Sequence, residues 1–481
     1  MPGYFINALI YSFKDILQRK EFSMRNLQNF YKAADIEKEY KRKLVTPDDA
    51  ASVVKPGYKI HIGTFGSIAH DFEAAIAKRK DELSDITLIS CLWSYDDTYE
   101  THKVDPEGEV FRIHTTQMSQ KDRRVKSAGH EWYIPMLYHD NCRMYHAAEK
   151  KLDMFVVMTG PMDRQGNFNL GITIGEARAL FETADIVMVE VNENMPHSEG
   201  MENYINIAEV DYVIQSSNYP LAELPVREGA GGADAKIAEL LLPEIEDGST
   251  LQLGIGAMPN HLGHLMVESD LKNLSIHTEM LVDSFVDMYE AGKITGNKAV
   301  HPGKMVYTFA LGSRRLYDFI DRNQTCMIAP VDYVNDPALI SQHEKMISIN
   351  AALQVDLYGQ VSSESIGFNH ISGQGGQMDF VEGAFRSKGG KSFLCTASTK
   401  THKDGTLESL IVPFMPPGGI VSTPRYATQY VVTEYGIVNL KGTSTWERAE
   451  LLISIAHPDF REDLIKQAEK QGIWKNSSKL L

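Results

Sequence analysis

Short apolar runs recur along the chain, and each is followed by a stretch in which apolar residues return at helical spacing. In each half a turn with a strand, a helical stretch and a second strand follow one another, over 55–63, 69–80 and 85–90 in the first half and over 246–254, 261–269 and 274–278 in the second. Strands rich in Val and Ile that alternate with helices are typical of mostly parallel sheets covered by helices on both faces. The pattern therefore predicts an α/β fold with two open α/β domains.

The two halves also resemble each other in sequence, which indicates an internal duplication. Gly63 and Gly254 end the first strand of each half and are separated by 191 positions. Gly166 and Gly359 stand in similar turns and are separated by 193 positions. We therefore expect two domains of similar plan. A third, looser pair aligns 184–191 with 428–434.

The length of 481 residues favours more than one domain. Prolines and glycines on either side of position 225 mark a linker. We expect a first domain over 40–225 and a second over 226–481, with the active site in the cleft between them. Residues 1–39 are expected to form an N-terminal extension without a signal peptide, and Met24 is an alternative start.

Composition limits the classes of function. The formal net charge is −16, which argues against a general nucleic-acid-binding protein but allows a local basic pocket for a phosphorylated ligand. The four cysteines lie far apart and form no C-x-x-C pair. Neither a zinc site nor a disulfide framework is therefore expected, and a reducing, cytoplasmic location fits. No apolar stretch is long enough to cross a bilayer, so no membrane partner is expected.

A first glycine motif, Gly254-Ile-Gly256-Ala257-Met258-Pro259-Asn260, lies between a predicted strand and a predicted helix. Glycines let the backbone approach a ligand closely, and a helix N-terminus presents free N–H groups to an anion or a carbonyl oxygen. A proline occupies the place of the third glycine of the dinucleotide fingerprint, which excludes that interpretation. A plain strand-to-helix turn explains the motif equally well when it is taken alone.

Glu279 follows the next strand, within His277-Thr-Glu279-Met. Ligands of open α/β sheets bind at the carboxyl ends of the strands, and a carboxylate there can form a covalent acyl intermediate. A solvated helix cap is the commoner role of a lone glutamate. The His-x-Glu spacing also occurs in zinc deaminases, but their P-C-x-x-C partner is missing, which excludes that class.

A second glycine motif, Ser372-Gly-Gln-Gly375-Gly376-Gln-Met-Asp-Phe, stands in the second half. Successive glycines can direct consecutive N–H groups toward an oxyanion, although a flexible turn would have the same composition. Lys400 and Lys403 follow, and could meet the phosphates of a ligand or a developing carboxylate charge. Surface lysines are more often only solvated.

Taken together, these motifs resemble the acetyl-CoA hydrolase/transferase family of CoA-transferases. The similarity extends from about residue 40 to residue 474 and is greatest to the butyryl-CoA:acetate branch, followed by the 4-hydroxybutyrate branch. Its specific elements are the ordered blocks 251–260, 276–280, 355–361 with 363–365, 372–380, 431–436 and 455–461.

The resemblance implies a ping-pong transfer of coenzyme A (CoA) between short-chain acids, with Glu279 as the covalent nucleophile and a glutamyl-CoA thioester as the intermediate. The implied reaction is butyryl-CoA plus acetate giving butyrate and acetyl-CoA. CoA is then a substrate, no cofactor or metal is permanently bound, and a homodimer is expected. The implied CoA-binding residues are Gly254, Gly256, Ala257, Met258, Pro259, Asn260, Ser372, Gly375, Gly376 and one of Lys400 and Lys403.

Several points of the resemblance stay open at the level of sequence. Backbone N–H groups near Met258 and Gly376 are implied to form the oxyanion hole, whereas the family's asparagine before the second glycine loop is replaced by Ser372. Residues 61–67 and 92–95 are expected to face the acyl pocket. An acyl-CoA hydrolase, a 4-hydroxybutyrate or propionate CoA-transferase and a catalytically silent CoA-binding protein are the alternatives.

Overall fold

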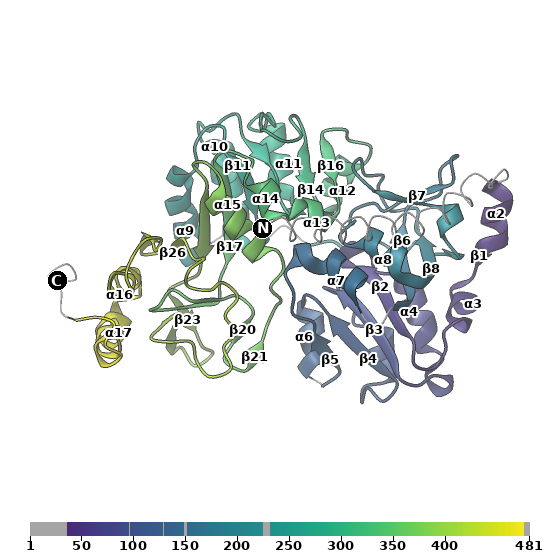
Figure 1. The fold of residues 1–481 in the computed structure, drawn as a ribbon, viewed down its shortest axis with the longest axis horizontal. Coiled ribbons are helices and arrows are strands. Elements are labelled where there is room, and N and C mark those ends of the chain that lie inside the picture. Colours follow the sequence, from purple (N-terminus) through teal and green to yellow (C-terminus); the bar gives the residue numbers. More distant parts are fainter. Residues whose placement is uncertain (1–35, 96, 128, 149–151, 225–230, 476–481) are drawn as a thin grey trace, which may run out of the picture.

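The computed structural model describes residues 36–95, 97–127, 129–148, 152–224 and 231–475. Two sheets form two lobes side by side (Figure 1), and the described strands of the first sheet all precede those of the second in the chain. The interpretations of residues 1–35 and of the proline and glycine linker at 225–230 lie outside the described residues. Helix α2 (Ile36–Lys43) spans the predicted boundary at residue 40 and is tied to the first lobe, since the Lys43 side chain donates to the Ile207 carbonyl over 2.7 Å.

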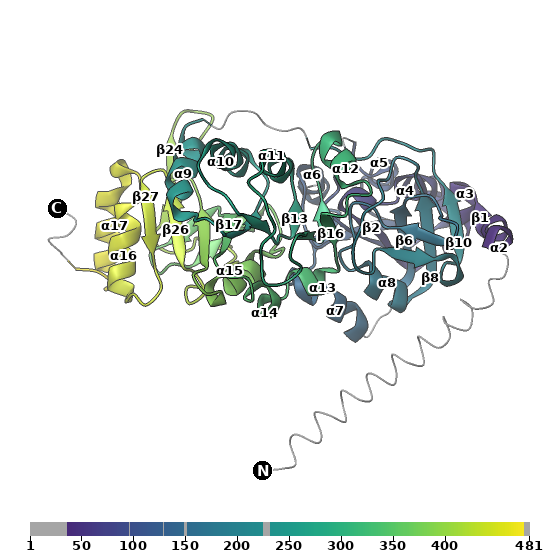
Figure 2. The same cartoon turned by 90° about the horizontal axis from the view of Figure 1, so that it is seen from above.

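The first lobe contains an eight-stranded sheet in which every pair is parallel. Its central strand β6 is buried along its length except at Asp153, because helices cover both faces. Figure 2 shows α4 on one face and α7 and α8 on the other. The spatial order of the strands is β1 (Leu44–Val45), β10 (Tyr212–Gln215), β8 (Ala184–Val191), β6 (Leu152–Thr159), β2 (Lys59–Thr64), β3 (Ile86–Cys91), β4 (Phe111–Thr115) and β5 (Glu131–Tyr133). The helices are α3 (Pro47–Ser52), α4 (His70–Ala77), α5 (Glu100–Val104), α6 (Gln120–Ser127), α7 (Asn141–Ala147) and α8 (Ala177–Thr183).

The second lobe contains a six-stranded sheet with parallel strands and one antiparallel edge. In Figure 2 helices α9, α10 and α11 lie on one face, and α14 and α15 lie on the other. The strands are, in spatial order, β12 (Ser275–Ile276), β11 (Thr250–Leu253), β17 (Met346–Ala351), β22 (Lys391–Cys395), β26 (Tyr430–Thr433) and β27 (Gly436–Asn439). The helices are α9 (Ala233–Leu241), α10 (Ala257–Glu268), α11 (Asp283–Glu290), α12 (Arg314–Ile320), α13 (Val331–Val334), α14 (Pro337–Ile340), α15 (Gln377–Arg386), α16 (Thr445–Ser454) and α17 (Pro458–Lys470).

Five strands of each sheet stand in the same spatial order. The order β3-β2-β6-β8-β10 in the first sheet corresponds to β12-β11-β17-β22-β26 in the second. The α/β class with open, largely parallel sheets in both domains is therefore confirmed. The third sequence pair is wrong, however, because it aligns β8 with β26, whereas the position of β8 in its sheet is that of β22. Both segments are apolar strands, and their composition alone does not fix their place in a sheet.

The second sequence pair is matched in detail. In the first lobe the Asp163 carboxylate accepts hydrogen bonds from the backbone and side chain of Asn167, over 2.8 and 3.1 Å. In the second lobe the Asp356 carboxylate accepts the same two bonds from Gln360, over 2.9 and 2.7 Å. The glycine in each turn has a left-handed backbone, with φ of 84° at Gly166 and 83° at Gly359.

Short strands between the two sheets join the lobes. The Ile174 N–H donates to the Thr308 carbonyl over 3.1 Å, and the Ala310 N–H donates to Ile172 over 2.8 Å. One continuous apolar core extends through both lobes. The joining strands are β13 (Met280–Leu281), β14 (Met305–Tyr307), β15 (Phe309–Ala310) and β16 (Cys326–Ile328).

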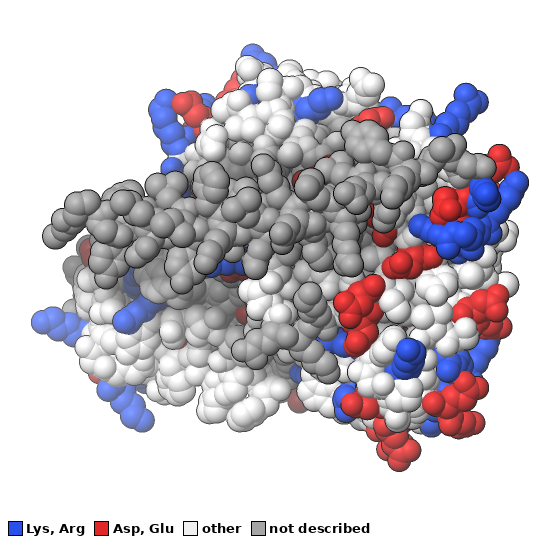
Figure 3. Space-filling view, turned by 45° about the vertical axis from the view of Figure 1, so that its right-hand side comes forward, with Lys and Arg blue, Asp and Glu red and all other residues white. Residues whose placement is uncertain are grey.

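The surface carries both signs of charge. On the described part of the face in Figure 3, acidic and basic side chains lie next to one another without a broad basic area. Among the described helices none is long and apolar enough to cross a membrane.

Candidate active site

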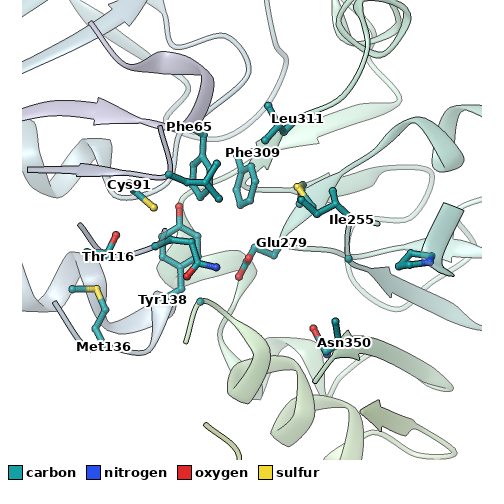
Figure 4. A pocket seen from close by; sticks show the side chains of 17 residues that line it. Phe65, Cys91, Thr116, Met136, Tyr138, Ile255, Glu279, Phe309, Leu311 and Asn350 are labelled. Atoms are coloured by element: carbon teal, nitrogen blue, oxygen red, sulfur yellow. The ribbon is translucent and has the colours of Figure 1, made fainter. Parts of the chain in front are cut away.

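Glu279 lies between β12 and β13, where the second sheet meets the first lobe. Its backbone carbonyl accepts hydrogen bonds from the N–H groups of Thr308 and Phe309, over 3.0 and 3.3 Å. The residue is only partly buried, and its side chain faces a cavity between the lobes (Figure 4). Glu279 therefore lies near the carboxyl end of a strand, as the sequence predicted.

Three groups of the second lobe determine the ionisation of this carboxylate. Asn335 Nδ2 donates to Glu279 Oε2 over 2.7 Å, and the Gly376 N–H donates to the same carboxylate. Asp379 adds a negative charge nearby. Burial raises the pKa of Glu279 to about 7, the hydrogen bond from Asn335 opposes this rise, and the charge of Asp379 adds to it. A carboxylate that is poorly solvated at neutral pH is more nucleophilic than one in bulk water.

Asp379 is fully enclosed and accepts hydrogen bonds from both lobes. His139 Nδ1 of the first lobe lies 2.6 Å from Asp379 Oδ1, and the His139 N–H donates to Oδ2 over 3.3 Å. Asn335 Nδ2 donates to Oδ2 over 3.2 Å. Burial raises the pKa of Asp379, and these hydrogen bonds lower it again.

The second glycine motif forms the loop before α15 and crosses from one lobe to the other. The Tyr138 N–H donates to the Gly375 carbonyl over 3.1 Å, and the Gln374 N–H donates to the Tyr133 hydroxyl over 2.8 Å. A side chain at Gly376 would overlap the carboxylate of Glu279 and the amide of Asn335. This close approach explains why a glycine must stand here.

The first glycine motif forms a shorter loop than predicted. Helix α10 begins at Ala257 rather than near His261, so that only Gly254 to Gly256 connect it to β11. Gly256 has a φ of 132°, which favours glycine, and the N-terminus of α10 follows it directly. Gly254, Ile255 and Pro259 line the cavity, and the Ile255 side chain is 45% exposed.

The cavity has a volume of about 220 Å³ and is lined from both lobes. Figure 4 shows Glu279 pointing into it from the second lobe, with Tyr138, Thr116 and Cys91 on the opposite side. Of the two segments expected to face the acyl pocket, only Phe65 and Leu92 line it. The lining is otherwise mostly apolar and consists of Cys91, Thr116, Gln117, Met136, Tyr138, Gly254, Ile255, Pro259, Met280, Phe309, Leu311, Asn350, Ala351 and Gly375.

Some predicted ligand residues lie outside the cavity lining. Lys400 and Lys403 belong to an exposed hairpin whose strands are β23 (Thr399–Thr401) and β24 (Leu407–Ser409). Ser372 is half-buried, and its N–H donates to the Glu364 carbonyl over 3.2 Å. Contacts of these residues with CoA stay predictions, as do those of Gly256, Ala257, Met258 and Asn260.

Sequence reasoning did not single out three residues around Glu279. Asp379 stands inside the second glycine motif, so that motif could have indicated it. Asn335 and His139 come from segments without a motif, and only the fold brings them to the site. Asn350, at the end of β17, also lines the cavity.

Two family models match the chain. The acetyl-CoA hydrolase/transferase N-terminal domain matches residues 26–225, and the C-terminal domain of the same family matches residues 312–468. The first match covers the first lobe and the second covers the C-terminal part of the second lobe, whereas residues 226–311, which include Glu279, lie between the two matches.

Curated proteins and solved structures show the same relationship. The chain is 45% identical over 444 residues to the probable butyrate:acetyl-CoA coenzyme A-transferase of Syntrophomonas wolfei, covering 92% of this chain and 98% of that protein. It is 44% identical over 449 residues to the butyryl-CoA:acetate CoA-transferase of Anaerostipes caccae, covering 92% and 99%. The crystal structure of RipA from Yersinia pestis is similar, with a TM-score of 0.82, 33% identity and coverage of 91% and 100%.

Proposed function

The chain belongs to the acetyl-CoA hydrolase/transferase family, and we propose that it transfers CoA from a short-chain acyl-CoA to acetate or another short-chain acid. The observation that carries this proposal is the partly buried Glu279 carboxylate, which faces a cavity between the lobes and lies against the second glycine loop. Butyryl-CoA is the proposed donor, in agreement with the names of the two curated relatives.

The proposed reaction exchanges one thioester for another. The Glu279 carboxylate attacks the acyl-CoA carbonyl, and the carbon–sulfur bond breaks to give a mixed anhydride and CoA thiolate. The thiolate attacks the glutamyl carbonyl and releases the carboxylate of the acid, leaving a glutamyl-CoA thioester. Acetate then reverses these steps and leaves as acetyl-CoA, so the energy of the thioester is kept and no ATP is needed.

The two glycine loops are the proposed sources of oxyanion stabilisation. The Gly376 N–H already donates to Glu279, and the first N–H groups of α10, including that of Met258, have no partner within their own helix. Losing one donor of this kind costs hydrolases about 3–4 kcal/mol. The apolar lining also excludes water, which would otherwise hydrolyse the anhydride or the thioester.

The lining favours an uncharged acyl chain. Among the described residues that line the cavity there is no Lys or Arg to neutralise a second carboxylate. Phe65, Met136, Phe309 and Leu311 instead offer apolar contact. Butyryl or propionyl therefore fits better than succinyl, since an unpaired charge in such surroundings is costly.

Replacing Glu279 tests the proposal directly. Glu279→Ala is expected to lose at least about three orders of magnitude of butyryl-CoA:acetate turnover, because alanine has no carboxylate to form the glutamyl-CoA thioester. Borohydride treatment of the acyl-CoA-loaded protein, followed by mass spectrometry, should locate the modification at residue 279. Near-normal turnover in Glu279→Ala would rule out its role as nucleophile.

The product distinguishes the transferase from the alternatives. A transferase makes acetyl-CoA in proportion to acetate, whereas a hydrolase with the same intermediate releases free CoA without it. A silent CoA-binding protein does neither. A series of acyl-CoAs that includes propionyl, butyryl, 4-hydroxybutyryl and succinyl would identify the donor, and the homodimer and the cytoplasmic location stay predictions of the sequence.

A further inference from the structure

A chain of hydrogen bonds runs from Glu279 to the surface of the other lobe. Asn335 Nδ2 lies 2.7 Å from Glu279 Oε2 and 3.2 Å from Asp379 Oδ2, and His139 Nδ1 lies 2.6 Å from Asp379 Oδ1. The first three residues belong to the second lobe, and His139 belongs to the first. The His139 side chain is 26% exposed and the Asp379 side chain is fully enclosed. The chain therefore connects a solvent-accessible imidazole to the carboxylate in the cavity.

The Asn335 amide can serve both carboxylates because its nitrogen carries two hydrogens. Its backbone is held as well, since its N–H donates to the Val331 carbonyl over 2.9 Å. The preceding carbonyl, that of Val334, lies 2.7 Å from His277 Nε2. These contacts fix the backbone from which the Asn335 amide reaches both carboxylates.

Two carboxylates on one neutral amide repel each other unless a further group compensates the inner one. His139 is the only described cationic or titratable nitrogen in hydrogen-bond reach of Asp379. Three carboxylates face the His139 ring: Asp379, Asp140 at 3.6 Å, and Asp336 at longer range. The hydrogen bond to Asp379 raises the pKa of His139.

We propose that His139 is a positioning residue, which acts through Asp379 and Asn335 to orient the Glu279 carboxylate and to set its charge. This inference rests on the proposed function. His139 follows Tyr138, whose N–H donates to Gly375 in the loop beside Glu279. The Glu279 carboxylate is thus fully oriented only where the first lobe packs against α15. Contact between the two lobes is therefore linked to the reactivity of Glu279.

The proposal predicts shifts of opposite sign in two variants. Removing the imidazole leaves the Asp379 charge uncompensated, so the pKa of Glu279 rises further. As the pH is lowered, the variant should then lose activity at a higher pH than the unchanged protein. Removing the Asp379 charge with Asp379→Asn lowers the pKa of Glu279. The other groups that face Glu279 across the cavity, Cys91 and Tyr138, are uncharged near neutral pH because burial raises the pKa of each.

The test measures kcat and KM for butyryl-CoA from pH 5.5 to 9 in His139→Ala, His139→Asn and Asp379→Asn. In His139→Ala we expect kcat at pH 7 to fall about tenfold and KM to change by less than about threefold. The apparent pKa of the acid limb in the pH profile of kcat/KM should increase by about 0.5–1 unit. His139→Asn keeps a neutral hydrogen-bond donor to Asp379. Most of the kcat lost in His139→Ala should therefore be restored, whereas the acid limb should stay shifted to higher pH. In Asp379→Asn the limb should move to lower pH.

His146→Ala is the matched control, because this histidine lies on α7 of the same lobe and pairs with Glu182 over 2.9 Å, away from the cavity. Its pH profile should equal that of the unchanged protein. If His139→Ala folds and loses kcat with an unmoved acid limb, or if Asp379→Asn shifts the limb upward, the proposal is overturned. Absence of CoA transfer in the unchanged protein would instead overturn the proposed function.

Discussion

The loops that follow β2 and β11 occupy the same position in the two sheets, yet only one of them is open. After Gly63 the chain makes a buried turn, Phe65–Ser67, and the Phe65 ring stacks on Phe309 with centroids 3.7 Å apart. After Gly254 no side chain of the loop packs in this way, and a side chain added at Gly254 would meet nothing within 4 Å. The first loop closes the cavity with its own side chains, and the second leaves room beside the N-terminus of α10.

The neighbouring strands show the same division. Strand β3 leads to Cys91 and Leu92, and strand β12 leads to Glu279. All three residues line the same cavity, and Figure 4 shows Cys91 and Glu279 on opposite sides of it. Equivalent positions of one fold thus supply a wall in the first lobe and the proposed nucleophile in the second, so position in the fold alone does not distinguish the two lobes.

The same substitution in both loops is the strongest way to test this difference. Gly63 has a φ of 93°, and a side chain there would overlap the Ser67 backbone, whereas Gly254 has neither restriction. Gly63→Ala is expected to cost about 2–5 kcal/mol of stability, seen as a lower midpoint of thermal unfolding. Gly254→Ala should leave the midpoint within about 1 °C and raise KM for acyl-CoA about tenfold, because CoA is expected to pass over this residue.

Each variant serves as the control of the other. Equal losses of stability would mean that the two loops are packed alike and that the comparison fails. An unchanged KM in Gly254→Ala would mean that CoA does not approach this loop.

The sequence indicates where Glu279 and the two glycine motifs stand relative to strands and helices, whereas their contacts with CoA stay predictions. Glu279 and both glycine motifs follow strands or precede helices, and periodicity together with glycine content indicates such positions. Helix α10 begins earlier than expected and includes Pro259, because proline is well tolerated in the first turn of a helix.

The residues that form the hydrogen-bond chain next to Glu279 could not be predicted in the same way. Asn335 lies at the end of the four-residue helix α13, and His139 lies in the other lobe. Neither has a composition that differs from an ordinary loop, and their role arises from contacts between segments far apart in the chain. The same limit explains why 184–191 was paired with 428–434, since strands of similar composition differ only in their sheet neighbours.

A second prediction concerns the stability that the protein loses by burying the Glu279 carboxylate. Burial raises the pKa of Glu279 from its ordinary value of 4.5 to about 7. The folded protein therefore binds this proton more tightly than the unfolded chain, so stability falls as the pH rises from about 4.5 to about 7 and stays at the lower level above 7. The full shift corresponds to at most about 3–4 kcal/mol, and contact with the open cavity reduces the expected cost to about 1–2 kcal/mol.

Glu279→Gln removes the charge and keeps the shape. At pH 8 denaturant unfolding should show the variant to be more stable by about 1–2 kcal/mol, and at pH 5 the gain should shrink below about 1 kcal/mol. Glu268→Gln, on the exposed side of α10, should change stability by less than about 0.5 kcal/mol at both values. A gain of equal size at both pH values would contradict the raised pKa.

The smallest expected effect is at Cys91, the counterpart of Glu279 in the first lobe. Its sulfur faces the cavity, so it is the rival nucleophile, but burial and the charge of Glu176 raise the pKa of the Cys91 thiol. A neutral thiol is a poor nucleophile. Cys91→Ala should therefore keep kcat for butyryl-CoA within about threefold, and iodoacetamide should not inactivate the unchanged protein.

The cavity should nevertheless respond to the lost sulfur. One removed heavy atom makes room for about one methylene, worth about 0.8 kcal/mol, so the ratio of hexanoyl-CoA to butyryl-CoA turnover in Cys91→Ala should rise by about twofold to fivefold. A folded variant without turnover would assign chemistry to the first lobe and remove the distinction between wall and nucleophile. An altered ratio with kcat retained would sharpen it, because Cys91 would then act on the acyl chain and Glu279 on the carbonyl.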